Sequence, residues 1–178
     1  MSNKQTGRMA LAGVLTALAL VCLLLTFSPL ATVGLAALAG VCGIPVVIEL
    51  GRRAGLIHYA AVAVLAAILA LTAEGTGMYV AFFGWYTVFK AFIEGKNLTR
   101  PLEWGIKIAV FAAAMAAYGA TWVFLLHMPI PHWFAVGMLP VLAVGLCAVF
   151  VVYDIGLTGL IGTYFSRVRP KIGNLFRF

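Results

Sequence analysis

The stretch VVYDIGLTGL, residues 151–160, places one carboxylate, that of Asp154, inside the last long apolar run of the chain. A continuous apolar run of this kind is typical of a helix that crosses a lipid bilayer. A charged side chain at such a depth costs at least a few kcal/mol, so it should face the interior of a helix bundle and find a partner there. Asp154 therefore indicates a bundle of membrane helices with a polar contact inside it.

The composition of the whole chain supports the same fold class. Hydrophobic residues make up 64% of its 178 residues and charged residues 10%, whereas soluble domains are about half apolar and a quarter charged. A membrane span needs about 20 apolar residues, so this length has room for about six helices and almost no extramembrane domain. We therefore expect an all-α, polytopic membrane protein whose single domain, residues 1–178, is a bundle of six transmembrane helices.

Glycine, proline and polar residues divide the apolar runs into six expected spans: about 9–27, 30–50, 56–73, 77–94, 102–126 and 134–165. No convincing cleavage site follows the first run, so we expect a retained span there and not a secretory signal. All twelve Lys and Arg residues fall on one side of this topology. The positive-inside rule then places both termini in the cytoplasm and explains the net charge without a nucleic-acid partner.

Asp154 has three candidate partners in the cytoplasmic half of the bundle: Lys107, Lys90 and Arg53. Lys107 is the first choice, because it lies about one and a half turns inside its span, so we predict an intramembrane ion pair between Asp154 and Lys107. Lys90, near a span end, is compatible with snorkelling towards the interface. Thr158, one turn from Asp154, could add a hydrogen bond. A catalytic acid is the alternative role for Asp154, but no chain of acids leads across the membrane.

The sequence contains no paired-glutamate helix, HExxH motif, serine elbow or phosphate-binding glycine loop, so we expect no enzyme. His127 and His132 flank a proline-rich turn, but no third ligand lies nearby, so neither a metal site nor a cofactor is expected. Cys22, Cys42 and Cys147 lie in apolar runs without paired spacing and are interpreted as small buried residues.

The first span begins RMALAGVLTALALV, residues 8–21, with Ala10, Gly13 and Ala17 at helical spacing. Small residues let helices approach closely in lipid, and packing within the bundle is their ordinary role. With six short spans, both ends inside and fewer than 200 residues, the chain resembles the substrate-binding S components of energy-coupling factor (ECF) transporters. The resemblance implies a subunit for vitamin or micronutrient uptake, with Ala10, Gly13 and Ala17 docking the coupling subunit and a partner ATPase pair supplying energy.

A ligand of such a transporter would bind at the outer segments. The candidate ligand-binding residues there are Glu74, Thr76, Tyr79, Tyr118, Trp122, His127 and Trp133. The aromatic residues of 77–94 could line a cavity together with Tyr118 and Trp122, although core packing is the ordinary role of such a face. The loop TFSPLA, residues 26–31, is shorter than the external cap usual in S components.

Three further stretches, VVIELGRRAGL (46–56), FFGWYTVFKAFIEG (82–95) and RPLEWGIKIAVF (100–111), resemble a group of small uncharacterised membrane proteins of Firmicutes. They bring together a cytoplasmic charged cluster of Glu49, Lys90, Glu94 and Glu103, beside Lys107. A charged cluster without a clear ligand loop favours an alternative function. The chain would then be a non-transporting membrane scaffold, similar in size and span count to the cell-shape protein MreD.

Overall fold

A computed structural model describes residues 3–27, 32–69, 74–96, 98–121, 123 and 139–171 of the chain. Within these residues every regular element is a helix, so the expected all-α class is confirmed. In chain order the elements are α1 (Asn3–Leu24), the 3-10 turn η1 (Leu25–Phe27), α2 (Thr32–Val41), α3 (Gly43–Leu50), α4 (Arg52–Leu69), α5 (Glu74–Met78), the π-helical turn η2 (Tyr79–Phe83), α6 (Gly84–Glu94), α7 (Arg100–Ala120), α8 (Leu139–Thr163) and the π-helical turn η5 (Tyr164–Val168).

Five stretches of the described chain are long and apolar enough to cross a membrane: Thr6–Leu24, Thr32–Leu50, Arg52–Leu69, Arg100–Ala120 and Ala143–Lys171. They overlap five of the six expected spans, with ends that differ by up to nine residues. The remaining one, 77–94, is helical from Glu74 to Glu94 through η2, but it is not among the five.

The segment that contains α5, η2 and α6 lies at the centre of the bundle. It packs against α2, α3, α4 and α7 and supplies several of the largest fully buried side chains, namely Tyr79, Phe82, Tyr86 and Lys90. Neighbouring helices cover these side chains, so this segment can carry polar residues such as Lys90 without exposing them to lipid.

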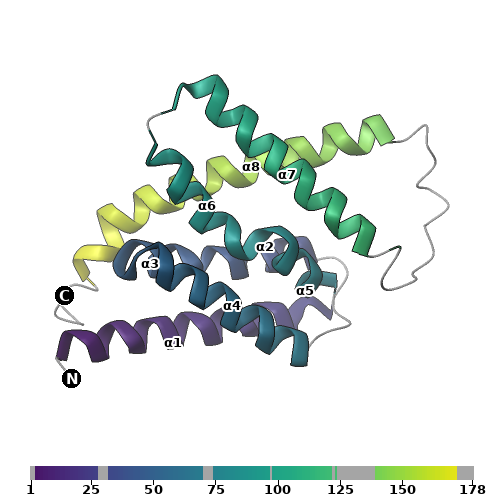
Figure 1. Cartoon of the computed structure of the whole chain (residues 1–178). Helices are drawn as coiled ribbons and strands as arrows, with labels where there is room; N and C mark the ends of the chain where they lie inside the picture. The colour runs from purple at the N-terminus through teal and green to yellow at the C-terminus, as the bar shows by residue number, and fades with distance from the viewer. Residues whose placement is uncertain are drawn as a thin grey trace.

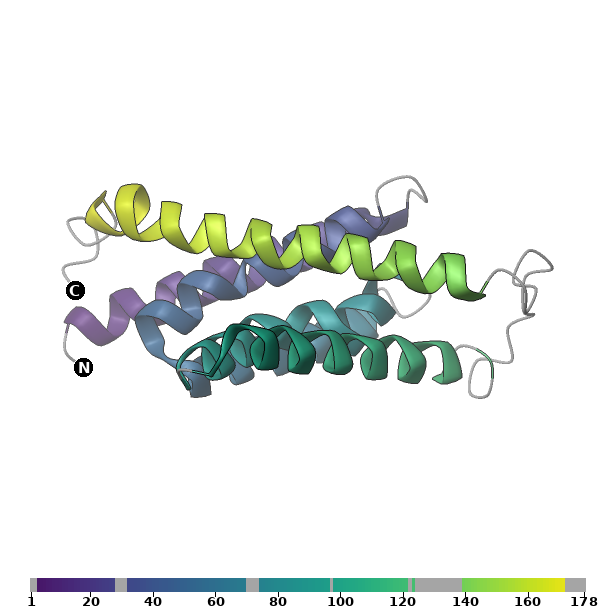
Figure 2. The ribbon, with the colours of Figure 1, turned by 90° about the horizontal axis from the view of Figure 1, so that it is seen from above.

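The long helices run side by side, and the first turn of α1 and the end of η5 lie at the same end of the molecule (Figures 1 and 2). The turns that join α3 to α4 and α6 to α7 lie at that end too (Figure 1). The basic residues Arg8, Arg52, Arg53, Lys96, Arg100, Arg167 and Arg169 lie in these segments or within one turn of them. We call this end of the bundle the basic end.

Aromatic rings fill the middle of the bundle, around Phe82. This ring contacts the rings of Phe83, Trp85, Tyr86, Phe111, Phe150 and Tyr153. Phe111 of α7 and Phe150 of α8 stack with their ring centroids 4.7 Å apart. The aromatic face of residues 77–94 thus packs in the core, which is the ordinary role considered for it.

The second span passes from α2 to α3 at Cys42, whose backbone keeps α-helical angles (φ −60°, ψ −21°). Pro45 has no N–H and its ring crowds the preceding turn, so the carbonyl of Val41 loses its regular helical partner. Gly40 lies just before this junction, and a Cβ atom there would come 2.5 Å from the carbonyl oxygen of Phe83. Only glycine fits this contact without a backbone shift. The expected span over 30–50 corresponds to one stretch, Thr32–Leu50, that is long and apolar enough to cross a membrane.

Helix α8 contacts the bundle through a narrow stripe. Its buried residues, with that of η5, are Phe150, Asp154, Leu157 and Tyr164, which recur at helical spacing. The opposite face exposes large apolar side chains such as Val144 and Val152, each 71% exposed. Such a face suits lipid, and among the described residues of α8 Asp154 is one of those that contact the bundle.

Candidate functional site

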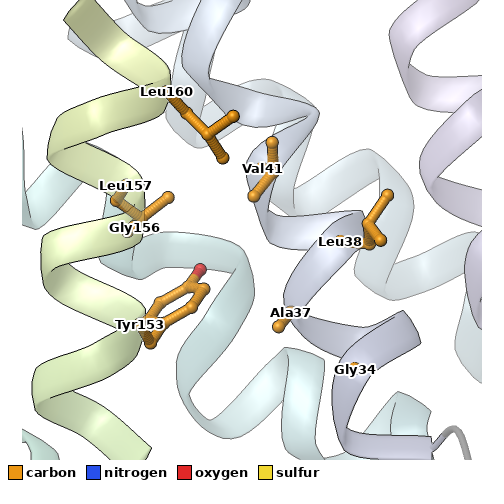
Figure 3. Close-up of a pocket in the computed structure, with 8 residues that line it drawn as sticks. All are labelled: Gly34, Ala37, Leu38, Val41, Tyr153, Gly156, Leu157 and Leu160. Carbon is orange, nitrogen blue, oxygen red and sulfur yellow. The ribbon is translucent and has the colours of Figure 1, made fainter.

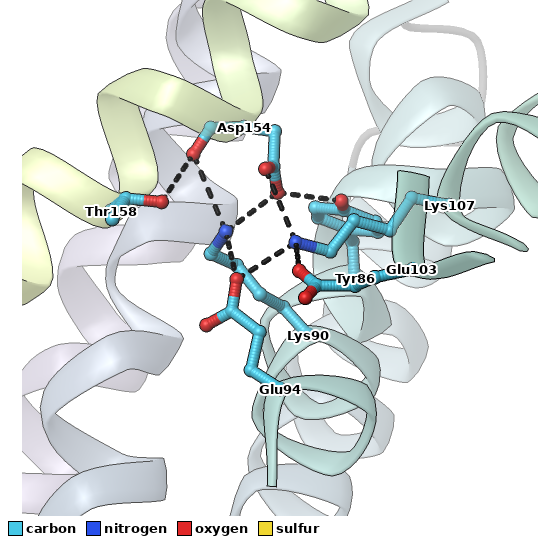
Figure 4. Close-up of polar contacts among 7 residues, drawn as sticks. All are labelled: Tyr86, Lys90, Glu94, Glu103, Lys107, Asp154 and Thr158. Atoms are coloured by element: carbon cyan, nitrogen blue, oxygen red, sulfur yellow. Dashed lines mark hydrogen bonds and ion pairs between the residues drawn. The ribbon is translucent and has the colours of Figure 1, made fainter. Parts of the chain in front are cut away.

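The carboxylate of Asp154 lies at the centre of a buried ion network formed by α6, α7 and α8 (Figure 4). Its Oδ1 accepts hydrogen bonds from the Tyr86 hydroxyl at 2.7 Å and from Lys90 Nζ at 2.7 Å. Its Oδ2 lies 3.3 Å from Lys107 Nζ. Asp154, Lys90 and Lys107 are only 2%, 1% and 1% exposed, so these charges meet with almost no solvent around them.

Two glutamates extend the network towards the basic end. Glu94 lies 2.6 Å from Lys90 and 2.8 Å from Lys107, and Glu103 lies 2.6 Å from Lys107. The side chains of Glu94 and Glu103 are 36% and 23% exposed, respectively. Two ammonium groups therefore face three carboxylates, and the network carries one net negative charge when all five groups are ionised.

Helical periodicity explains how the local sequence builds this network. Tyr86, Lys90 and Glu94 are successive residues of one stripe on α6, each four positions apart, and Glu103 and Lys107 have the same spacing on α7. Asp154 of α8 faces both stripes (Figure 4). Since three donors already occupy its two oxygens, the carboxylate acts as a cross-link between three helices in this arrangement.

The structure brings Lys107, the partner predicted for Asp154, within contact distance, but Lys107 is not the nearest lysine. Lys107 is in contact, yet Lys90 is closer, at 2.7 Å against 3.3 Å. The interpretation of Lys90 as a snorkelling residue is wrong, because its side chain is buried and points to Asp154. Arg53 is exposed, and Thr158 donates to the backbone carbonyl of Asp154 at 3.0 Å and not to its carboxylate.

The expected charged cluster divides into two groups. Lys90, Glu94 and Glu103 belong to the ion network, whereas Glu49 forms a separate contact at the end of α8. Arg169 Nε lies 3.1 Å from Glu49 Oε1, and the Tyr164 hydroxyl donates to the same oxygen at 3.4 Å. Glu49 therefore fastens the last turns of α8 and η5 to α3.

The structure describes four of the seven candidate ligand-binding residues. Glu74 is exposed, whereas Thr76 and Tyr79 are buried with hydroxyl groups that have no hydrogen-bond partner among the described residues. Tyr79 packs against Tyr59, with 6.0 Å between ring centroids, and the Tyr118 ring lies 2.8 Å from the Cβ position of Gly77. Tyr79 and Tyr118 thus pack against different neighbours. The other three, Trp122, His127 and Trp133, lie outside the described residues.

The predicted docking residues of α1 share an outward face. Ala10, Gly13 and Ala17 are exposed, while Leu11 and Ala19 of the same helix are buried. A Cβ atom added at Gly13 would meet no other atom within 4 Å. The small residues therefore form a shallow surface on the outside of the bundle instead of a contact within it.

A groove of about 210 Å³ lies between α2 and α8. Its lining residues are Gly34, Ala37, Leu38, Val41, Tyr153, Gly156, Leu157 and Leu160 (Figure 3). The lining is apolar apart from the Tyr153 hydroxyl, whose oxygen is itself buried. The sequence did not indicate this groove, because which side chains two helices share depends on how each is rotated.

Within the described residues, no group of three His, Cys, Asp or Glu side chains could hold a metal ion. Comparisons of the chain with protein-family models, with curated proteins and with solved structures found no match.

Proposed function

We propose that the chain is a multi-pass subunit of the bacterial cytoplasmic membrane that docks a partner membrane protein through Ala10, Gly13 and Ala17 of α1. The proposed partner is an ECF-type coupling subunit with its ATPase pair. The chain would then be the substrate-binding component of an uptake transporter for a vitamin or another micronutrient.

The observation that carries this proposal is the outward position of the small residues on α1. Lipid tails provide no hydrophobic drive for helix association, so helices in a membrane associate where small side chains allow close backbone approach. A small-residue face that already packed inside the bundle could not serve a partner. Here Ala10, Gly13 and Ala17 are exposed between bulkier exposed residues such as Val14 and Leu18.

The proposed topology has six spans, with residues 77–94 as the fourth, and both termini in the cytoplasm. The gathering of basic residues at one end of the bundle supports this orientation, because Lys and Arg are enriched in cytoplasmic loops. Residues 74–94 can cross the bilayer despite their polar composition, since the surrounding helices shield Lys90 from lipid.

A membrane scaffold similar to MreD is the second candidate, and the ion network favours it. The network ties three helices together and ends at the basic end in two partly exposed glutamates, Glu94 and Glu103. A rigid bundle with a charged cytoplasmic surface suits a protein that holds partners in place.

The test is an affinity purification from native membranes in mild detergent, with the bound proteins identified by mass spectrometry. The wild-type chain is compared with a Gly13→Leu/Ala17→Leu variant, whose bulky side chains would block close approach at α1. Gly119→Leu is the matched control, because Gly119 of α7 is also exposed and a Cβ atom there meets nothing within 4 Å.

Recovery of an ATPase pair and its coupling subunit by the wild type and the control, but not by the α1 variant, would support the transporter proposal. Recovery of cell-wall or division proteins would establish the scaffold instead. If the α1 variant retained every partner of the wild type, the docking role of Ala10, Gly13 and Ala17 would be refuted.

A further inference from the structure

The groove between α2 and α8 has an open side and unfilled space in it (Figure 3). Two of its lining residues, Leu38 and Leu160, are 53% and 46% exposed, whereas Leu157 is 1% exposed. A Cβ atom added at Gly34 or Gly156, which also line the groove, would meet no other atom within 4 Å. The two glycines therefore leave room that no side chain of the described residues fills.

The size of the groove limits what can occupy it. Its walls run from Gly34 to Val41 on α2 and from Tyr153 to Leu160 on α8, a length of about 10.5 Å. An α-helix with its side chains is about 10 Å across, so a piece of that length would need about 800 Å³. The groove offers about 210 Å³, and an apolar cavity of about 150 Å³ takes up a hydrocarbon such as benzene. The groove therefore fits a thin hydrocarbon chain and is too small to seat a helix.

The groove lies in the half of the membrane that adjoins the basic end. Tyr153 is 14 residues from Leu139 and 14 from Arg167, or about 21 Å from each. Half of a bilayer with its headgroups is about 20–22 Å thick, so Tyr153 lies near the midplane and Arg167 at the level of the headgroups. From Tyr153 the groove runs to Leu160 and Val41, in the direction of the basic end. It therefore lies at the depth of the acyl chains of one leaflet only.

Basic side chains follow the groove at its basic end. Arg167, Arg169 and Lys171 come within 11 residues of Leu160. In the part of the chain that the structure describes, Glu49 pairs with Arg169, and no carboxylate contacts Arg167 or Lys171. Their positive charge complements a phosphate group, and basic residues at a membrane surface favour anionic lipids. The groove and these charges thus match the two parts of one phospholipid molecule.

We propose that the groove between α2 and α8 binds one acyl chain of an anionic phospholipid from the leaflet at the basic end, with the lipid phosphate beside Arg167 and Lys171. An unfilled groove would leave its lining atoms without van der Waals partners, and the acyl chain supplies them at Gly34 and Gly156. The surrounding lipid is itself apolar, so the fit holds the chain in the groove and the headgroup charge selects the lipid. The bound lipid would join α8 to α2.

Native mass spectrometry of the full chain in detergent micelles tests this proposal. Phosphatidylglycerol is the anionic probe and phosphatidylcholine the probe without net charge. The wild type should bind one phosphatidylglycerol several-fold more tightly than phosphatidylcholine. Gly34→Leu/Gly156→Leu fills the groove and should weaken that binding several-fold. Gly145→Leu is the matched control, because Gly145 is exposed on α8 outside the groove and a Cβ atom there meets nothing within 4 Å.

Arg167→Gln/Lys171→Gln tests the headgroup separately. Each basic residue near the membrane surface strengthens the binding of anionic lipid about fivefold. This variant should therefore bind phosphatidylglycerol at least several-fold more weakly, and phosphatidylcholine as the wild type does. Equal binding of the two lipids by the wild type, or unchanged binding by the groove variant, would overturn the proposal. A dimer that Gly34→Leu/Gly156→Leu abolished would overturn it too, by showing that a second copy covers the groove.

Photo-crosslinking locates the acyl chain in the wild-type protein and so does not depend on the folding of a variant. The probe is phosphatidylglycerol with a diazirine near the end of one acyl chain, activated in bilayers that contain the full chain. Labelling should concentrate in residues 34–41 and 153–160. Val64 of α4 is the control, because it is 60% exposed and lies about 18 Å from Arg52, at a similar depth. Labelling around Val64 as strong as in the groove would refute the lipid site.

Discussion

The ion network predicts an order of mutational effects that a simple ion pair would not give. Lys90→Met removes the ammonium group that contacts Asp154 at 2.7 Å and Glu94 at 2.6 Å. Asp154 is then left with Lys107 at 3.3 Å, and the network has two negative charges in excess. Removing one partner from a buried ion pair costs about 3–5 kcal/mol, so we expect a loss of that size in the free energy of unfolding.

Asp154→Asn should cost less. The substitution leaves both lysines paired with Glu94 or Glu103, and the network becomes neutral. What the variant loses is mainly the extra strength of the hydrogen bonds that the charged carboxylate of Asp154 accepts. A hydrogen bond to a charged group contributes about 1.5–3 kcal/mol. The double variant Lys90→Met/Asp154→Asn removes both charges, so its loss should fall short of the sum of the single losses by about 1–3 kcal/mol.

The assay is reversible unfolding in mixed micelles with increasing SDS, followed by far-ultraviolet circular dichroism. Lys107→Met/Asp154→Asn provides the comparison, and its coupling should be smaller because the distance is longer. Additivity within about 0.5 kcal/mol for both pairs would show that Asp154 is not coupled to the lysines. A larger loss for Asp154→Asn than for Lys90→Met would refute the charge argument itself.

Two further predictions concern packing and the end of α8. Gly84→Ala should lose about 1–3 kcal/mol of stability, because its Cβ atom would lie 2.5 Å from the Tyr59 ring. Gly105→Ala has open space at its Cβ position and should be neutral or gain up to about 1 kcal/mol. Thermal melting that reversed this order would contradict the packing described here. Glu49→Gln should lose less than about 1 kcal/mol of unfolding free energy in the same SDS titration, because Arg169 is 52% exposed and screened by solvent. A loss as large as that of Lys90→Met would show that the contact between Glu49 and Arg169 is buried in the membrane protein.

Much of the fold followed from composition and charge. Long apolar runs predicted the helices, with ends that differ by up to about six residues, because lipid requires internally satisfied backbone and leaves few other structures open. The gathering of basic residues at one end also followed from the order of the spans. The change from α2 to α3 at Cys42 was not predicted, although Pro45 was its signal, because proline is often tolerated in membrane helices.

The site was only partly predictable for a geometric reason. Depth along a helix can be counted from the sequence, so Lys107 and Lys90 could both be named as candidates for Asp154. Which lysine points inward depends on the rotation of each helix about its axis. The i to i+4 spacing of Tyr86, Lys90 and Glu94 was the signal that could have indicated a shared inward face, since a snorkelling lysine has no need of such neighbours.

The π-helical turn at Tyr79–Phe83 has a consequence for how this chain tolerates insertions and deletions. Such a turn accommodates one residue more than an α-helical turn. Deleting one residue from it would therefore restore a regular α-helical turn and keep Lys90 facing α8, whereas deleting one residue between Gly84 and Lys90 would rotate Lys90 by about 100° around the axis. A segment that itself carries no charge can thus absorb a change of length that would otherwise separate the charges downstream.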